Sequence, residues 1–202
     1  MKCTEKCEYY NKASGTCCRT MPLSVVYYDA ECLFEKGQKY YEAQQSINRK
    51  AITKELSARL EYHIDPKHDP RIYWAREVTL DYGTAEQKRV DYMVFEPVTN
   101  SVSGIEKGDF FCYEVKSSVE DFHSKNGHNM IGDFNYYLMP ESVYEQVKGE
   151  IHRNIGIYVP DEINGIRCIK KAKRQSREYP LSMLLLMMFR SANRDRIKGK
   201  TS

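Results

Sequence analysis

The sequence predicts an α/β fold with a central mixed sheet of about five strands flanked by helices. Short runs of aromatic and β-branched residues, which are typical of buried strands, recur between residues 72 and 170. Two of these runs, 134–139 and 154–159, are separated by a helical segment, 141–150, that begins after Pro140. This strand, helix, strand order indicates that part of the sheet is parallel.

The other core elements can be placed along the chain in the same way. Residues 46–61 are expected to form a helix, with Ser46 as its N-cap. Its apolar residues recur at helical spacing: Ile47, Ala51, Ile52, Leu56 and Leu60. The first three strands are expected at 72–82, 89–95 and 110–115.

The C-terminal part combines a short strand at 166–170 with an apolar stretch at 181–190. The stretch is apolar nearly all round, which predicts a buried terminal helix or a contact between copies in a homo-oligomer. Residues 167–202 carry 11 Lys and Arg against 2 Asp and Glu, whereas the rest of the chain has a net charge of −6. A basic tail on an acidic body is a common arrangement in nucleic-acid-binding proteins, and the alternative is a solvated tail.

Length and composition indicate a single globular domain with appendages. The chain has 202 residues, of which 41% are hydrophobic. No stretch approaches the length of a membrane span, and the N-terminus does not read as a signal peptide. We therefore expect a cytoplasmic protein that has no membrane partner, in which seven cysteines do not form a disulfide framework.

The N-terminus contains four cysteines within 16 residues: Cys3, Cys7, Cys17 and Cys18. In a cytoplasmic protein this clustering favours a Zn²⁺ site that would staple a short segment, and the alternative is a loose N-terminus with free thiols. Residues 23–28 fit either a strand or a turn of helix, and 31–43 fit a helix. The predicted division is a cysteine-rich segment at 1–20, a core at 21–166 and a basic segment at 167–202.

A charged pair marks the end of the third predicted strand. Glu114 and Lys116 are two residues apart, so their side chains point to the same face of the strand. Asp91 lies near the start of the preceding strand, and a polar loop at 100–109 joins the two. If the strands pair, the carboxylates converge at one end of the sheet. Two carboxylates and an ammonium there would suit Mg²⁺ and a phosphate group.

The order Asp91, then Glu114-x-Lys116, resembles the core of the PD-(D/E)XK nuclease superfamily. Residues 114–122, Glu-Val-Lys-Ser-Ser-Val-Glu-Asp-Phe, are more particular and resemble the MmcB-like DNA repair proteins of that superfamily. The resemblance spans residues 46–160 and includes later strands that end in proline. A Lys/Trp-rich stretch that follows in those proteins is missing here.

The resemblance implies a restriction-endonuclease-like core and a metal-dependent nuclease. Asp91 and Glu114 would hold Mg²⁺ or Mn²⁺ together with the backbone carbonyl of Val115. Lys116 would orient or activate the attacking water. An acid on the first core helix of the superfamily faces the site, and Glu55 matches that position.

Glu55 could instead be a surface residue that forms an ion pair with Arg59, four positions later. Lys125 and Asn129 lie in the polar loop after the third strand, where we expect contacts with substrate.

The predicted function is hydrolysis of phosphodiester bonds in DNA, in repair or in mobile-element or phage DNA metabolism. The alternatives are a non-catalytic DNA-binding or repair-accessory protein on the same fold, or a zinc-stapled interaction protein with a simple Glu114–Lys116 ion pair.

Overall fold

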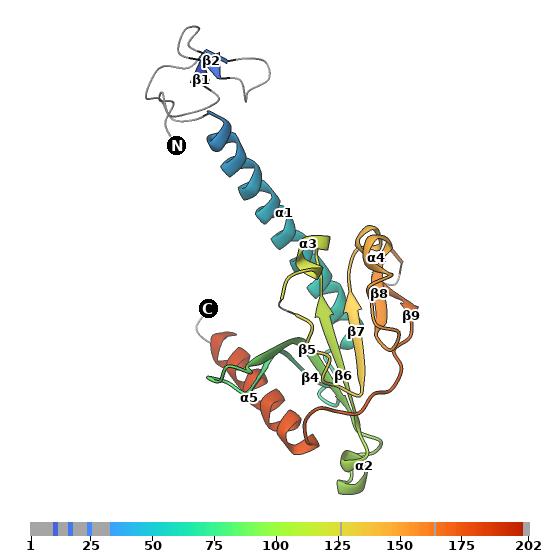
Figure 1. Cartoon of the computed structure of the whole chain (residues 1–202). Coiled ribbons are helices and arrows are strands. Elements are labelled where there is room, and N and C mark those ends of the chain that lie inside the picture. The colour runs from blue at the N-terminus through green and yellow to red at the C-terminus, as the bar shows by residue number, and fades with distance from the viewer. Residues whose placement is uncertain are drawn as a thin grey trace. The chain divides into compact units, whose positions relative to one another are not determined.

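A computed structural model gives the fold (Figure 1). It describes the backbone of residues 10–11, 16–17, 24–25, 33–125, 127–163 and 165–199. Side-chain surroundings are described for 48–195, except at 126 and 164, and for 197. The chain divides into two units, Met1–Lys50 and Ala51–Ser202.

The first unit contains a small antiparallel sheet in the order β1-β2-β3. Its strands are β1 (Tyr10–Asn11), β2 (Thr16–Cys17) and β3 (Ser24–Val25). The side chains of the four cysteines predicted to bind Zn²⁺ lie outside the described residues. That prediction therefore remains one.

Helix α1 (Leu33–Ile64) begins in the first unit and continues into the second. The prediction of Ser46 as an N-cap is wrong, because this residue lies inside the helix. Residues 33–43 of the first predicted helical segment and all of the second, 46–61, are parts of this one helix, and no proline lies between them to end it.

The second unit is built on a six-stranded mixed sheet in the order β4-β5-β6-β7-β8-β9. The pairs β6·β7 and β7·β8 are parallel, and the other pairs are antiparallel. This confirms the α/β class, with six strands rather than about five. The strands are β4 (Tyr73–Leu80), β5 (Lys88–Glu96), β6 (Asp109–Val115), β7 (Phe134–Leu138), β8 (Gly156–Asp161) and β9 (Gly165–Lys170).

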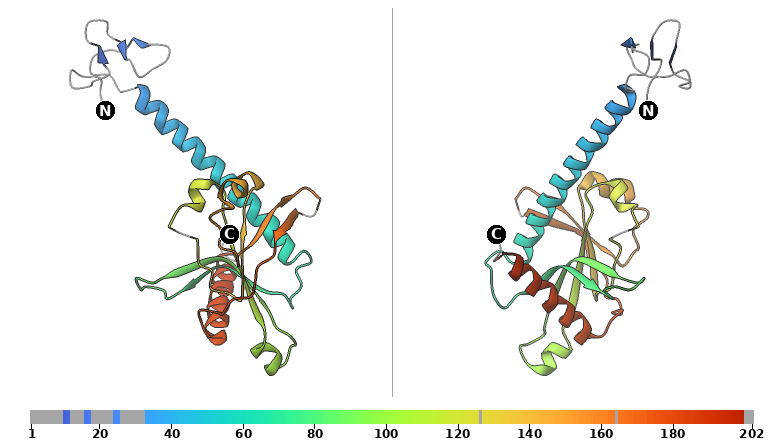
Figure 2. Two further views of the ribbon diagram at one scale, coloured as in Figure 1. Left: turned by 45° about the vertical axis from the view of Figure 1, so that its right-hand side comes forward. Right: turned by 90° about the vertical axis from the view of Figure 1, so that its left-hand side faces the viewer.

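Helices cover both faces of this sheet (Figures 1 and 2). The apolar residues of α1 pack on Tyr92 and Tyr113, whereas α5 packs on Met93 and Cys112. Neighbouring strand residues point to opposite faces, so α1 and α5 lie on opposite sides. Helix α4 shares the α5 face. The remaining helices are α2 (Val102–Glu106), α3 (Val119–Phe122), α4 (Glu141–Val147) and α5 (Leu181–Gly199).

The predicted C-terminal segment at 167–202 is joined to the core. The predicted boundary between residues 166 and 167 falls inside β9, which pairs with β8. Helix α5 contributes Leu184, Met187 and Met188 to the core on its face of the sheet. None of the described helices is both long and apolar enough to cross a bilayer.

Candidate functional site

The pairing of β5 with β6 brings the two predicted carboxylates together. Tyr92 lies opposite Tyr113 in this antiparallel pair, so Asp91 and Glu114 occupy the next position outward. The Asp91 carboxylate accepts a hydrogen bond of 2.9 Å from the Val115 N–H. The three predicted metal-binding residues are therefore neighbours at one end of the sheet.

Glu114 is fully buried, with 0% exposure. Neither of its carboxylate oxygens has a hydrogen-bond partner among the described residues. Asp91 and the Asn129 N–H lie close enough to influence it, but without hydrogen-bond geometry. Burial, with a contribution from the Asp91 charge, raises the pKa of Glu114 to about 9. Burial also raises the pKa of Asp91, and the hydrogen bond from Val115 opposes that rise.

Lys116 lies beside the carboxylates and is only 2% exposed. Its Nζ donates a hydrogen bond of 3.1 Å to the backbone carbonyl of Asp121. The Asp121 carboxylate in turn accepts from the Ser117 N–H, and Ser118 caps α3. The turn after β6 therefore fixes the position of the lysine. Desolvation lowers the pKa of Lys116, while the nearby carboxylates act in the opposite direction.

Gly127 closes one side of this group. Its φ is +71°, and a Cβ atom there would lie 2.8 Å from Lys116 Nζ and 3.0 Å from Glu114 Oε2. A side chain at this position would therefore collide with both charged groups, and the backbone conformation favours glycine. This residue was not predicted from the sequence. Its only signal there was a glycine within a polar loop.

The two residues after Gly127 hold this backbone in place. The ring of His128 hydrogen-bonds at 2.6 Å to the Tyr137 hydroxyl through Nδ1 and at 2.8 Å to the Phe122 carbonyl through Nε2. The Asn129 side chain donates a hydrogen bond of 2.7 Å to the Arg89 carbonyl.

The two residues of this loop that were predicted to contact substrate differ in their surroundings. The Asn129 amide is engaged with the protein backbone, so it supports the loop from within. Lys125, the other predicted contact, is exposed.

Glu55 does not lie with the other predicted site residues. Its carboxylate is 61% exposed and pairs with Arg59 at 2.8 Å, which was the alternative for this residue. Leu56 and Leu60 face the sheet, so Glu55 is turned aside by the helical geometry. The prediction that Glu55 completes the site is corrected: Glu55 is absent from the recess that contains Asp91, and the α1 residues that line this recess are Thr53, Lys54, Ser57, Ala58 and Glu61.

A polar recess of about 580 Å³ opens on the Asp91 side of the group. Residues of α1, β4, β5, β6 and α5 surround it. They are Thr53, Lys54, Ser57, Ala58, Glu61, Arg76, Glu77, Arg89, Asp91, Tyr92, Val115 and Asp195. Glu114 is absent from this lining.

The donor set fits a hydrated divalent cation. Among the described residues, no three His, Cys, Asp or Glu side chains converge to form a complete protein-only metal site. Mg²⁺, however, keeps several waters and is usually bound through one or two carboxylates. Asp91 and the unpartnered oxygens of Glu114 supply such a pair, and a cation there would compensate their burial.

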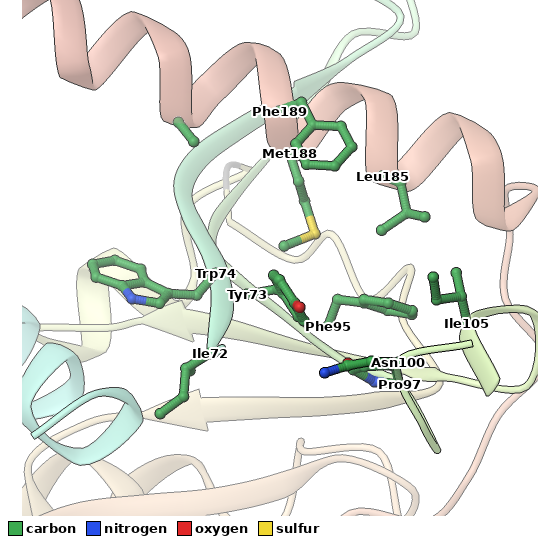
Figure 3. Close-up of a pocket in the computed structure, with 11 residues that line it drawn as sticks. Ile72, Tyr73, Trp74, Phe95, Pro97, Asn100, Ile105, Leu185, Met188 and Phe189 are labelled. Atoms are coloured by element: carbon green, nitrogen blue, oxygen red, sulfur yellow. The ribbon is translucent and has the colours of Figure 1, made fainter. Parts of the chain in front are cut away.

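A second recess, of about 440 Å³, has a different chemistry (Figure 3). It lies between β4, the connection from β5 to β6, and α5. Figure 3 shows the ring of Phe189 and the side chains of Met188 and Leu185 reaching toward it from α5. No charged side chain lines it: its residues are Ile72, Tyr73, Trp74, Phe95, Pro97, Asn100, Ile105, Leu185, Met188, Phe189 and Ala192.

Comparisons with known proteins give one structural likeness. No family model matches the sequence, and no curated protein matches it. Among solved structures, the chain is similar to the SPO1766 protein of unknown function from Silicibacter pomeroyi. The TM-score is 0.49 and the identity is 18%, over 72% of this chain and 88% of that chain.

Proposed function

We propose that this chain is a metal-dependent nuclease that hydrolyses phosphodiester bonds in DNA, in repair or in mobile-element or phage DNA metabolism. The observation that carries the proposal is the buried carboxyl group of Glu114, whose oxygens have no hydrogen-bond partner among the described residues, beside Asp91 and Lys116. Folding alone gives no reason to bury a carboxyl group and an amine together beside a second, half-buried carboxylate, because each loses hydration.

Hydrolysis of a phosphodiester forms a bond between a water oxygen and phosphorus and breaks the bond from phosphorus to the leaving oxygen. The water loses a proton and the leaving oxygen gains one. Asp91 and Glu114 would hold Mg²⁺ or Mn²⁺, which when bound supplies positive charge against the phosphoryl oxygens.

The Lys116 amine lies beside the carboxylates and is largely desolvated. Its lowered pKa favours a role in moving a proton from the attacking water, and in its charged form it offsets negative charge on the phosphate. The Val115 N–H holds the Asp91 carboxylate in orientation, which leaves that group fixed relative to the lysine.

One observation favours a second candidate, a non-catalytic DNA-binding or repair-accessory protein. The Lys116 amine is engaged with the Asp121 carbonyl and lies under Gly127, so it is not presented to solvent. In that case the charged group would be a structural feature of the fold.

Cleavage of a panel of single-stranded, duplex and branched DNA and of RNA, with Mg²⁺, Mn²⁺ or EDTA, separates the two candidates. We expect metal-dependent cleavage that falls by at least about 100-fold in Lys116→Met, since removing a proton-transfer group costs about 10²–10⁴ in rate. Lys107→Met removes an exposed charge before the start of β6, at the other end of that strand from the site, and serves as the matched control. Circular dichroism checks that each variant is folded. Absence of cleavage of every substrate, or equal cleavage by Lys116→Met, would contradict the nuclease proposal.

A further inference from the structure

The structure restricts the direction from which a ligand reaches the carboxylates. Gly127 packs directly against Glu114 and Lys116, both of which are buried. Asp91 and Val115, in contrast, line the polar recess of about 580 Å³. Its size lies within the usual range of about 300–1,000 Å³ for small-molecule sites. A ligand of nucleotide size would therefore approach from the recess side.

Three cationic side chains line this recess, and one of them is neutralised. Arg76 lies 3.1 Å from Asp195 and 3.6 Å from Glu61, so two carboxylates balance its charge. It is tied to the protein by these contacts and has little net charge to offer an anion.

The other two cations, Lys54 and Arg89, are differently placed. Both are exposed, and neither forms an ion pair with any residue in the described part of the chain. Lys54 comes from α1 and Arg89 from β5, two residues before Asp91. The recess therefore has two exposed cations on its wall, on different elements, that form no ion pair with the described residues; the Arg89 charge also acts on Asp91, where it lowers the pKa of that carboxyl group.

We propose that Lys54 and Arg89 form a phosphate-binding pair that holds a nucleic-acid backbone phosphate in the recess beside Asp91. The proposal rests on the proposed function for the identity of the ligand. An arginine guanidinium binds phosphate through two parallel hydrogen bonds, and a lysine ammonium binds it as a compact point charge. The hydroxyl groups of Thr53 and Ser57 lie on the same wall and add polar character. Lys54 and Arg89 are positioning residues that act before any chemical step.

The test is metal-free binding of a fluorescein-labelled oligonucleotide, single-stranded and duplex, followed by anisotropy in EDTA at several salt concentrations. Each phosphate contact contributes about 0.9 to the slope of log affinity against log salt for duplex DNA and about 0.7 for a single strand. Lys54→Met and Arg89→Met keep the apolar stems and remove the charges. Lys107→Met is the matched control, because Lys107 follows α2, before the start of β6, at the other end of that strand from Val115.

We expect each of the two variants to reduce the slope by about 0.7–0.9 and the double variant by about twice as much, with the control unchanged. Slopes equal to wild type in both variants, an equal drop in Lys107→Met, or absence of wild-type binding in EDTA would each overturn the proposal. If metal-dependent cleavage persists in any of those cases, only the phosphate-binding pair fails. If the slopes drop as expected but no substrate is cleaved, the nuclease proposal fails and the pair stands as a binding site.

Discussion

The apolar recess and the carboxylate end of the sheet differ in what their residues gain from folding. The apolar recess between β4 and α5 is lined by side chains that contact with any apolar partner would remove from water. The carboxylate end of the sheet contains Glu114 and Lys116, which lose hydration on folding, and the Glu114 oxygens obtain no hydrogen bond in return. A buried polar group without a hydrogen bond is more costly than exposed apolar surface, so the carboxylate end carries the stronger indication of a specific ligand.

This difference has a consequence that depends on pH. At the carboxylate end, Glu114 gains a proton on folding at neutral pH, because its pKa is raised to about 9 from its ordinary value of 4.5. Stability from this group is therefore present at low pH and is lost as the pH rises through about 9. Among the described residues, no Asp, Glu, His, Lys or Arg side chain lines the apolar recess.

The largest expected effect is on the metal-free protein carrying Glu114→Gln. The amide cannot ionise, so the variant should gain stability relative to wild type as the pH rises from 5 to 9, by at least about 2 kcal/mol given about 1.4 kcal/mol per pKa unit. Thermal unfolding in EDTA at pH 5, 7 and 9 measures this. A stability difference that stays constant with pH would show that Glu114 is ionised in the folded protein.

A second prediction concerns the close approach of Gly127 to Lys116 and Glu114 and its effect on stability. Gly83 has a similar φ of +80° but nothing within 4 Å of an added Cβ, so Gly83→Ala carries the backbone strain alone, about 1–2 kcal/mol. We expect Gly127→Ala to lower the free energy of unfolding by about 1 kcal/mol more than Gly83→Ala does, since it also displaces Lys116 and Glu114. Urea unfolding of the two variants gives the comparison. Equal losses would mean that the loop at Gly127 moves away from Lys116 and Glu114 without a measurable cost in stability.

A third effect concerns the apolar side of the comparison. Helix α5 exposes Phe189 by 66% and Leu186 by 52% beside the apolar recess, and we propose that copies of the chain associate there. Phe189→Ser should weaken self-association at least tenfold in sedimentation, because truncated aromatic anchors at interfaces often cost 2 kcal/mol or more. Tyr82→Ser, at an exposed tyrosine outside this recess, is the control. A wild-type chain that sediments as a monomer at high concentration would remove this interface.

The smallest expected effect is that of Glu55→Gln. The Glu55–Arg59 pair is exposed, and pairs of this kind contribute about 0–1 kcal/mol. Cleavage and metal affinity should stay within about twofold of wild type, as measured alongside Lys116→Met. A large loss of metal affinity would return Glu55 to the site and contradict the placement of its side chain.

Much of the sheet could be predicted from sequence, because buried strands have a local signature. Alternating aromatic and β-branched residues placed β5 and β6 within one or two residues of their observed bounds. The polar loop between them was interpreted as a hairpin loop, and a hairpin makes the pair antiparallel and brings Asp91 next to Glu114.

The features that were wrong or missed depend on contacts between distant segments. Glu55 was assigned to the site from its position along the helix, but the rotation of α1 is set by Leu56 and Leu60 packing on the sheet. The role of Gly127 depends on how closely its loop approaches β6. Lys54 and Arg89 line the same recess only because α1 packs beside β5. None of these distances has a signature in the local sequence.

The most direct test of the central claim is calorimetry of Mg²⁺ and Mn²⁺ binding at pH 7, in two buffers of different ionisation enthalpy, for wild type and Glu114→Gln. A cation that binds Glu114 must displace the proton held there, so we predict millimolar or tighter binding with release of about one proton in wild type and neither in the variant. Absence of binding heat in wild type, or binding that is unchanged in Glu114→Gln, would contradict a metal site at the carboxylate end of the sheet.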